Sequence, residues 1–292
     1  MAERPRTPIR KPRVAFVLGG GGHMGTSEVG MLRALLERGV VPHLVLGTSV
    51  GALNGAAVAA DPTPAAADLL EQVWNGLGQD PVFDRSPFAG AANLVRTRTH
   101  LHSNRPLRLL IERMLAAKTF ADLRVPFQCV AACIERAAEH WFAEGPLTEA
   151  ILASCAVPGL LPAVEIGGEH FVDGGIVNSI PVSRAVQLGA TDVYVLHVGR
   201  IEQPLTPPRN LWQVAVVSFE IARRHRFAFD LEHVPEGVAV HVLPTGETDP
   251  VRPESLAALR YRDFSSVSRR IEQARAATAA YLDGPGIGTT SC

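Results

Sequence analysis

Short apolar runs alternate with amphipathic segments through the first sixty residues. Val14–Leu18 is an uninterrupted apolar run that predicts a buried strand, and glycines follow it at once. Residues 26–38 carry apolar side chains at helical spacing, and Gly39 supplies a C-terminal stop. Leu44–Leu46 is a second apolar run, followed by the small residues of 47–60. This order predicts parallel strands covered by helices.

The rest of the chain continues this alternation less regularly. Further strands are predicted at 125–134, 192–198 and 238–243, and a hairpin at 165–172. Further helices are predicted at 148–156, 210–226 and 263–282. We expect 61–124 to form a helical cap over one end of the sheet, with 84–108 as a candidate lid. Because no clean linker is visible, we predict one α/β domain over 14–292.

Composition places the chain among packed globular proteins. Of its 292 residues, 47% are hydrophobic and 20% charged, and the formal net charge is −1. This balance argues against a nucleic-acid partner, because phosphate binding requires a broad basic field. No run approaches the roughly 18 apolar residues that span a bilayer. Four cysteines are too few for a disulfide framework and are wrongly spaced for zinc, so we expect no zinc site and a reduced, cytoplasmic compartment.

Residues 1–13, MAERPRTPIRKPR, hold five basic side chains and three prolines. A signal peptide would continue into an apolar stretch and a cleavage site, whereas VAFVL runs straight into glycines. We therefore expect a flexible basic arm. A solvated terminus and peripheral contact with acidic lipid head groups are the two alternatives for it. The sequence does not indicate an oligomeric state.

The sequence Gly47-Thr48-Ser49-Val50-Gly51 is a G-x-S-x-G motif between a predicted strand and a predicted helix. A serine on such a turn has its hydroxyl raised above the sheet, and the helix N-terminus that follows favours negative charge. Gly47 and Gly51 let the turn pack without Cβ clashes. Ser49 is therefore our candidate nucleophile, and a plain strand-to-helix turn is the alternative.

The glycine loop Gly20-Gly21-Gly22-His23-Met24-Gly25 fits two kinds of site. As G-x-G-x-x-G it matches a dinucleotide-binding fingerprint, but the next strand ends in the serine turn and not in an acid that would hold a ribose. Alternatively, the backbone N–H groups of Gly20, Gly21 and Gly22 donate to an oxyanion beside Ser49. We favour the oxyanion hole and keep nucleotide binding as the alternative.

A serine nucleophile needs a base, and the chain offers two kinds of candidate. A Ser-His-Asp triad in α/β-hydrolase order would use His225, His233 or His241, but none follows a strand as a triad histidine does. Asp173 lies in FVDGG at 171–175, after an apolar pair and before two glycines. It is the preferred base, and the alternative is an acid that only forms a hairpin turn.

Three motifs together resemble the patatin-like phospholipases. LGGGGHMG at 18–25, GTSVG at 47–51 and DGG at 173–175 occur in the order of that family. The segment 153–182 is also similar to the family's segment around its catalytic aspartate, and the resemblance covers about 14–200. It implies a three-layer α/β/α sandwich with a mainly parallel central sheet. It also implies a dyad of Ser49 and Asp173, with Gly20, Gly21 and Gly22 as the oxyanion loop.

The resemblance further implies hydrolysis of a carboxylic ester, an acyl chain on a lipid, without a cofactor. Five more glycines would support the motifs: Gly25, Gly47, Gly51, Gly174 and Gly175. One residue departs from the pattern, because similar members usually carry Arg or Lys where this sequence has Met24. That departure keeps open a second hypothesis, a catalytically weak or inactive protein that binds lipids or acyl groups.

Overall fold

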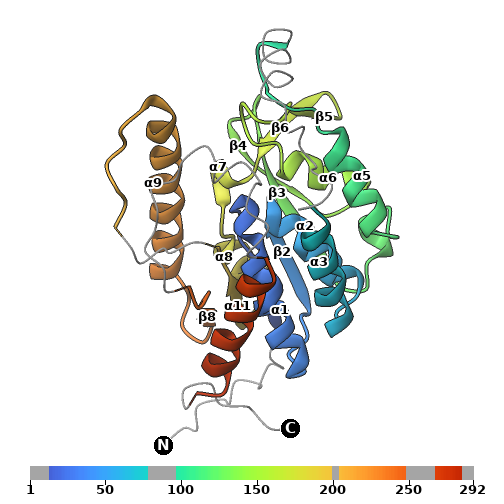
Figure 1. Ribbon diagram of the computed structural model, residues 1–292, viewed down its shortest axis with the longest axis vertical. Coiled ribbons are helices and arrows are strands. Elements are labelled where there is room, and N and C mark those ends of the chain that lie inside the picture. Colours follow the sequence, from blue (N-terminus) through green and yellow to red (C-terminus); the bar gives the residue numbers. More distant parts are fainter. Residues whose placement is uncertain (1–12, 78–96, 199–203, 248–266, 285–292) are drawn as a thin grey trace, which may run out of the picture.

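A computed structural model describes residues 13–77, 97–198, 204–247 and 267–284, and eight strands lie in this part of the chain. They are β1 (Val14–Leu18), β2 (Leu44–Thr48), β3 (Phe127–Cys133), β4 (Ala138–Phe142), β5 (Val164–Ile166), β6 (Glu169–Asp173), β7 (Asp192–Leu196) and β8 (Ala239–Val242). They form one sheet in the order β5-β6-β3-β2-β1-β7-β8, and β4 also pairs with β3 (Figure 1).

The sheet is mixed and mostly parallel. β1 is parallel to both of its neighbours, β2 and β7, and the pairs β2–β3 and β7–β8 are also parallel. β4 and β6 run antiparallel to β3, and β5 runs antiparallel to β6. β1 is buried on both faces after its first residue, as expected for an apolar strand at the centre of a parallel sheet.

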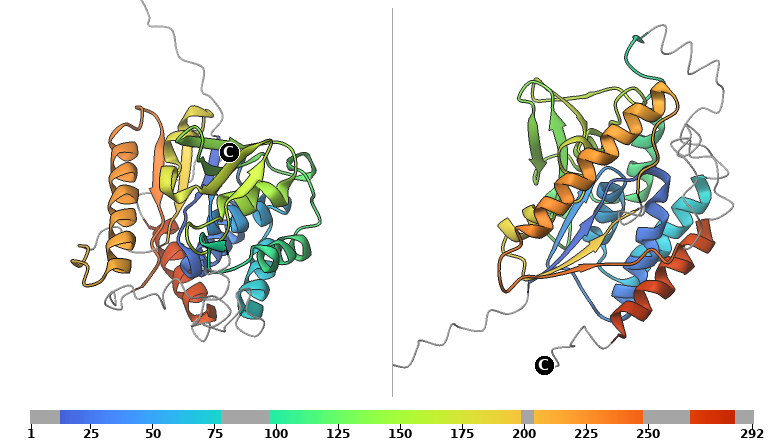
Figure 2. Two further views of the ribbon diagram at one scale, coloured as in Figure 1. Left: turned by 90° about the horizontal axis from the view of Figure 1, so that it is seen from above. Right: turned by 90° about the vertical axis from the view of Figure 1, so that its left-hand side faces the viewer.

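Helices cover both faces of the sheet (Figures 1 and 2). The described helices are α1 (Thr26–Glu37), α2 (Val50–Ala60), α3 (Pro64–Leu77), α5 (Arg105–Met114), α6 (Leu147–Ser154), α7 (Gly175–Asn178), α8 (Val182–Gln187), α9 (Leu211–Glu232) and α11 (Val267–Leu282). Neighbouring residues of a strand point to opposite faces. Phe16 and Leu18 of β1 accordingly join a core with α1, α2 and α11, while Ala15 and Val17 join a second core with α8 and α9. This arrangement confirms the predicted α/β/α sandwich.

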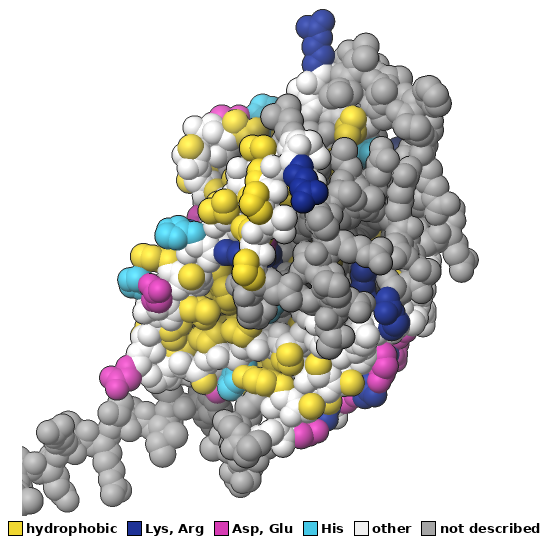
Figure 3. All heavy atoms as spheres, turned by 60° about the vertical axis from the view of Figure 1, so that its left-hand side comes forward, with side chains coloured by type: hydrophobic (Ala, Val, Ile, Leu, Met, Phe, Trp, Pro, Cys, Tyr) yellow, Lys and Arg dark blue, Asp and Glu magenta, His cyan; other side chains and the backbone are white. Residues whose placement is uncertain are grey.

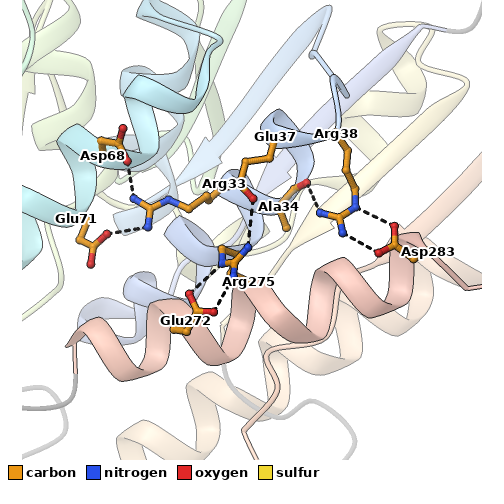
Figure 4. A network of polar contacts seen from close by, with 9 residues as sticks. All are labelled: Arg33, Ala34, Glu37, Arg38, Asp68, Glu71, Glu272, Arg275 and Asp283. Carbon is orange, nitrogen blue, oxygen red and sulfur yellow. Dashed lines mark hydrogen bonds and ion pairs between the residues drawn. The ribbon is translucent and has the colours of Figure 1, made fainter.

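The helical layer of α1, α3 and α11 is held mainly by apolar packing. Val267, Ile271 and Ala274 of α11 are buried in the core that α1 also enters. Ion pairs also cross its outer surface, where Arg33 of α1 contacts Asp68 and Glu71 of α3 and Arg275 of α11 contacts Glu37 of α1 (Figure 4). Exposed ion pairs contribute only about 0–1 kcal/mol each, so the apolar residues dominate this interface.

Several sequence predictions differ from the structure at their edges. β4 was not predicted, and α9 continues six residues beyond the predicted end at Arg226. Arg13 does not belong to a flexible arm, since its side chain donates to Leu188 O at 2.7 Å and its amide to Thr191 Oγ1 at 2.8 Å. Parts of three predictions lie outside the described residues. They are residues 1–12 of the predicted arm, residues 78–96 of the predicted cap, which include part of the candidate lid, and residues 263–266 of the predicted last helix.

Candidate active site

Strand β3 brings the carboxyl ends of β2 and β6 together. β4 pairs with β3 along Cys129–Cys133 and so occupies one edge of that strand. β2 pairs with β3 up to Val130 and β6 pairs from Ala131 onward, and both overlap β4, so both must lie along the opposite edge. Thr48 at the end of β2 is opposite Val130, and Asp173 at the end of β6 is opposite Ala131. The residue after Thr48 therefore comes next to Asp173.

That residue, Ser49, occupies a strained turn at the start of α2. Its φ is 54° and its ψ −122°, a combination that non-glycine residues rarely adopt. The side chain is nearly buried, with 8% of its surface exposed. The Ser49 amide donates to Ser154 Oγ of α6 at 2.9 Å, which gives the strained turn a buried hydrogen-bond partner. Gly51 permits this turn, because a Cβ at that position would collide with the carbonyl of Leu18.

The Ser49 hydroxyl donates a hydrogen bond of 2.6 Å to Asp173 Oδ2. The other carboxylate oxygen, Oδ1, accepts the amide of Gly175 at 2.7 Å. Asp173 is only 4% exposed, and this burial raises its pKa to about 6, against the opposing effect of the hydrogen bonds from Ser49 and Gly175. The acid is therefore mostly ionised at neutral pH, yet close enough to that pH to accept a proton.

The glycine loop lies beside the serine. A Cβ on Gly20 would be 3.5 Å from the Ser49 Cβ. However, the Gly20 amide donates to Ser179 O at 3.0 Å, so the fold already uses it. Within the described segments, the amides of Gly21 and Gly22 have no protein acceptor. Of the three expected oxyanion donors, the amides of Gly21 and Gly22 therefore remain as candidates.

The five supporting glycines share one property, which is close packing against the two catalytic candidates or their neighbours. A Cβ would collide with Val50 at Gly25, with Gly51 and Ala52 at Gly47, with Leu18 at Gly51, with Val130 at Gly174 and with Phe219 at Gly175. Their absent side chains allow the loop, the serine turn and the aspartate strand to approach one another.

A buried polar network that the sequence did not predict lies at the end of the glycine loop. Asn54 of α2 donates through Nδ2 to Gly25 O at 3.0 Å and to Glu28 Oε2 at 2.8 Å, and Trp74 Nε1 donates to Asn54 Oδ1 at 3.2 Å. Glu28 is fully buried, and burial raises its pKa well above its ordinary value. Asn54 thus joins Glu28 to the end of the loop and fixes the loop's last carbonyl.

The three histidines of the triad hypothesis lie elsewhere. His225 is exposed on α9, and His233 ends that helix with its Nδ1 at 2.8 Å from Phe229 O. His241 lies on β8, separated from β2 by two strands, and stacks on Tyr194. The partner of the Ser49 hydroxyl is an aspartate, so the geometry favours the dyad over the triad.

Two properties of the described segments bear on metals and membranes. No group of three or more His, Cys, Asp or Glu side chains in them is arranged to hold a metal ion. None of the helices in them has both the length and the apolar character needed to cross a membrane.

Comparison with known proteins gives the family. The chain matches the family model "Patatin-like phospholipase" over residues 16–186. It is 30% identical over 193 residues to a patatin-like phospholipase domain-containing protein of Caenorhabditis elegans, a match that covers 65% of this chain and 14% of that protein. It is 31% identical over 180 residues to an uncharacterized NTE family protein of Mycobacterium tuberculosis, covering 61% of this chain and 47% of the relative.

A solved structure was also found, that of human GIVD cytosolic phospholipase A2 bound to a fluorophosphonate inhibitor. It is 13% identical, with a TM-score of 0.48 over 93% of this chain and 58% of that one. The chain spans less than half the length of either of these two relatives. Since the family match extends over more than half of the 292 residues, the chain belongs to the patatin-like phospholipase family.

Proposed function

We propose that this protein is a serine acyl hydrolase, a phospholipase A-type or lipase-type esterase that cleaves carboxylic esters of lipids. The observation that carries the proposal is the 2.6 Å hydrogen bond from Ser49 Oγ to Asp173 Oδ2. Membership of the patatin-like phospholipase family supports the reaction class. Ser49 is the nucleophile and Asp173 the general base, and neither role requires a metal.

In the first half of the reaction, Ser49 Oγ attacks the carbonyl carbon of the ester as its proton passes to Asp173. The carbonyl oxygen becomes an oxyanion, which the amides of Gly21 and Gly22 stabilise. Collapse of this intermediate breaks the bond to the alcohol, which leaves with the proton that Asp173 has held. One oxyanion donor contributes about 10²–10³ in rate.

In the second half, a water molecule attacks the acyl-serine ester while Asp173 takes its proton. The second oxyanion uses the same two amides. Its collapse releases the carboxylic acid, and the proton on Asp173 returns to Ser49. Throughout, the Gly175 amide holds Asp173 Oδ1, so that Oδ2 keeps facing the reacting oxygen.

Exposed apolar side chains near the aspartate support an acyl chain as part of the substrate. Ile176 follows Gly175 and is 44% exposed, and Phe219 of α9 is 39% exposed with its ring against Gly175. Hydrophobic side chains gather on the side of the molecule where α9 lies (Figure 3). Burial of a methylene group contributes about 0.8 kcal/mol, so such a surface favours long chains over short ones.

A fluorophosphonate probe and a panel of acyl esters test the proposal. We expect the wild type to be labelled on Ser49 and to hydrolyse esters, and Ser49→Ala to lose both properties. The chain offers a matched control, because Ser183 also donates to an aspartate, Asp230, at 2.7 Å but does not lie on the strained turn. Ser183→Ala should retain labelling and activity.

The same assays separate the other hypotheses. If the wild type is neither labelled nor active but binds fatty acids, the chain is a non-catalytic acyl-binding protein. The triad hypothesis requires that alanine at His225, His233 or His241 abolishes turnover. The dyad requires that these variants stay active and that Asp173→Asn does not.

A further inference from the structure

Arg223 is a buried arginine on α9, with 6% of its surface exposed. Its guanidinium makes hydrogen bonds in three directions. Nε donates to Ser179 Oγ at 3.1 Å, Nη2 donates to Val198 O at 2.8 Å, and Nη1 donates to both carboxylate oxygens of Glu220 at 2.9 and 3.0 Å. A flat, rigid donor group of this kind fixes its partners relative to one another.

Two of these partners are the residues that hold the glycine loop. Ser179 accepts the Gly20 amide through its carbonyl oxygen, and its Oγ lies 3.2 Å from where a Gly20 Cβ would be. Val198, two residues beyond β7, packs so closely on Gly21 that a Cβ there would collide with its side chain. Gly20 and Gly21 therefore both contact residues that are hydrogen-bonded to Arg223. Gly21 carries the first of the two proposed oxyanion donors.

Two backbone hydrogen bonds also hold this part of the loop, from the Gly19 amide to Leu196 O at 2.9 Å and from the Met24 amide to Gly21 O at 3.3 Å. Gly20, Gly21 and Gly22 carry no side chains, and Met24 offers no charge. The network of Asn54 holds only the far end, at Gly25 O. Glu220, three residues before Arg223 on α9, is the acid that pairs directly with the guanidinium, at 2.9 Å.

We propose that Arg223 is a positioning residue for the oxyanion hole: it joins Ser179 to Val198 and thereby places the Gly21 and Gly22 amides beside Ser49. The inference rests on the proposed hydrolase function, because an oxyanion hole has a role only in acyl transfer. The α9 helix, 174 positions away from Ser49, thus supplies the cation that the loop lacks.

This role predicts a specific kinetic signature. The oxyanion exists only in the transition state and the tetrahedral intermediates, so misplaced amides lower kcat and leave KM almost unchanged. Complete loss of one oxyanion donor lowers the rate by about 10²–10³. Because Arg223 acts through other residues, we expect Arg223→Gln to lower kcat by about 10- to 100-fold.

The test compares Arg223→Gln, Arg223→Lys and the control Arg224→Gln with the wild type. Arg224 is the adjacent arginine on α9 and pairs with the same Glu220 carboxylate. Three measurements are made on each protein: kcat and KM on a short-chain ester, the thermal midpoint, and backbone amide hydrogen exchange of residues 19–24. Arg223→Lys keeps a charge but lacks the planar fork, and it also serves if the glutamine variant does not fold.

We expect both Arg223 variants to lose kcat with KM within about twofold of the wild type, and to exchange faster at 19–24 than elsewhere. Arg224→Gln should match the wild type in all three measurements. Full activity in either Arg223 variant would overturn the proposal, and so would faster exchange spread evenly over the protein. If the wild type itself is inactive, the proposed hydrolase function fails, while the exchange measurement still decides whether Arg223 holds the loop.

Discussion

Gly175 donates its backbone amide to Asp173 Oδ1 at 2.7 Å, which leaves the other carboxylate oxygen to the hydroxyl of Ser49. Both hydrogen bonds favour the ionised acid, but burial opposes them and has the larger effect, so the pKa of Asp173 rises to about 6. Because the proposed acceptor of the serine proton titrates just below neutrality, both catalysis and stability should depend on pH in this range.

The first prediction concerns the rate. Only ionised Asp173 can accept the Ser49 proton, so kcat/KM should fall about tenfold per pH unit below pH 6 and level off above it. A pH profile on a neutral short-chain ester, with folding checked by circular dichroism at each pH, measures this. A profile that stays flat down to pH 4.5 contradicts Asp173 as the base.

The second prediction concerns stability, and its sign is the opposite. The pKa of Asp173 is raised from 3.8 in a free chain to about 6 in the fold, so the fold favours the protonated acid. The stability it contributes is present below pH 3.8 and is lost as pH rises through 6. The loss corresponds to about 3 kcal/mol in the free energy of unfolding at most.

Asp173→Asn should therefore stabilise an inactive protein. At pH 8 we expect the variant to be about 1–3 kcal/mol more stable to urea than the wild type, because it removes a buried charge. At pH 4, where the wild-type acid is protonated, the two midpoints should converge. If the variant is less stable than the wild type at pH 8, burial is not the dominant effect on Asp173.

The motifs predict the candidate nucleophile and base but not the contact between them. G-x-S-x-G and DGG are local patterns, and each predicted an element that the structure contains. The contact between Ser49 and Asp173 depends on β2 and β6 sharing one edge of β3. That sharing is set by the pairing of Thr48 with Val130 and of Ala131 with Asp173, which are 82 and 42 positions apart, and a local pattern carries no information about such pairings.

Three other features of the structure were not predicted, because the local sequence at each gives a misleading pattern or none. β4 reads AEHWF and is only partly buried, so its polar residues obscured the alternation of a strand. Arg223 is one of three arginines within RRHR at 223–226, which resembles a solvated face. Which of these side chains is buried depends on the angle at which α9 packs against the rest of the protein. The use of the Gly20 amide by Ser179 likewise depends on tertiary contact.

The third prediction concerns the turn of the nucleophile. Ser154→Ala leaves the Ser49 amide buried without its acceptor, which costs about 1–3 kcal/mol of stability. The strained turn also loses a constraint, so kcat should fall while the protein remains folded. Urea denaturation and ester assays measure the two effects. Ser268→Ala, which removes an exposed 3.4 Å contact with Asn75, is the control and should change neither.

The fourth prediction concerns the glycine loop. Gly21→Ala places a methyl group against Val198 and must displace the loop, so we expect kcat to fall about 10²–10³-fold, as when an oxyanion donor is lost. Gly76→Ala is the control, because no neighbouring atom of the described residues lies within 4 Å of the added methyl group on α3, and it should stabilise that helix by about 0.5–1 kcal/mol. Equal activity in both variants contradicts an oxyanion role for Gly21.

The last prediction concerns substrate length. If the exposed side chains of Ile176 and Phe219 contact the acyl chain, removing them weakens binding in proportion to the apolar area lost. Ile176→Ser and Phe219→Ala should each raise KM for a sixteen-carbon ester severalfold and leave KM for a four-carbon ester unchanged. Val41→Ser is the control, since Val41 is equally exposed but precedes β2 at the other end of that strand. An equal rise for both esters would mean that these residues stabilise the site and do not select the chain, because only contact with the distal carbons depends on length.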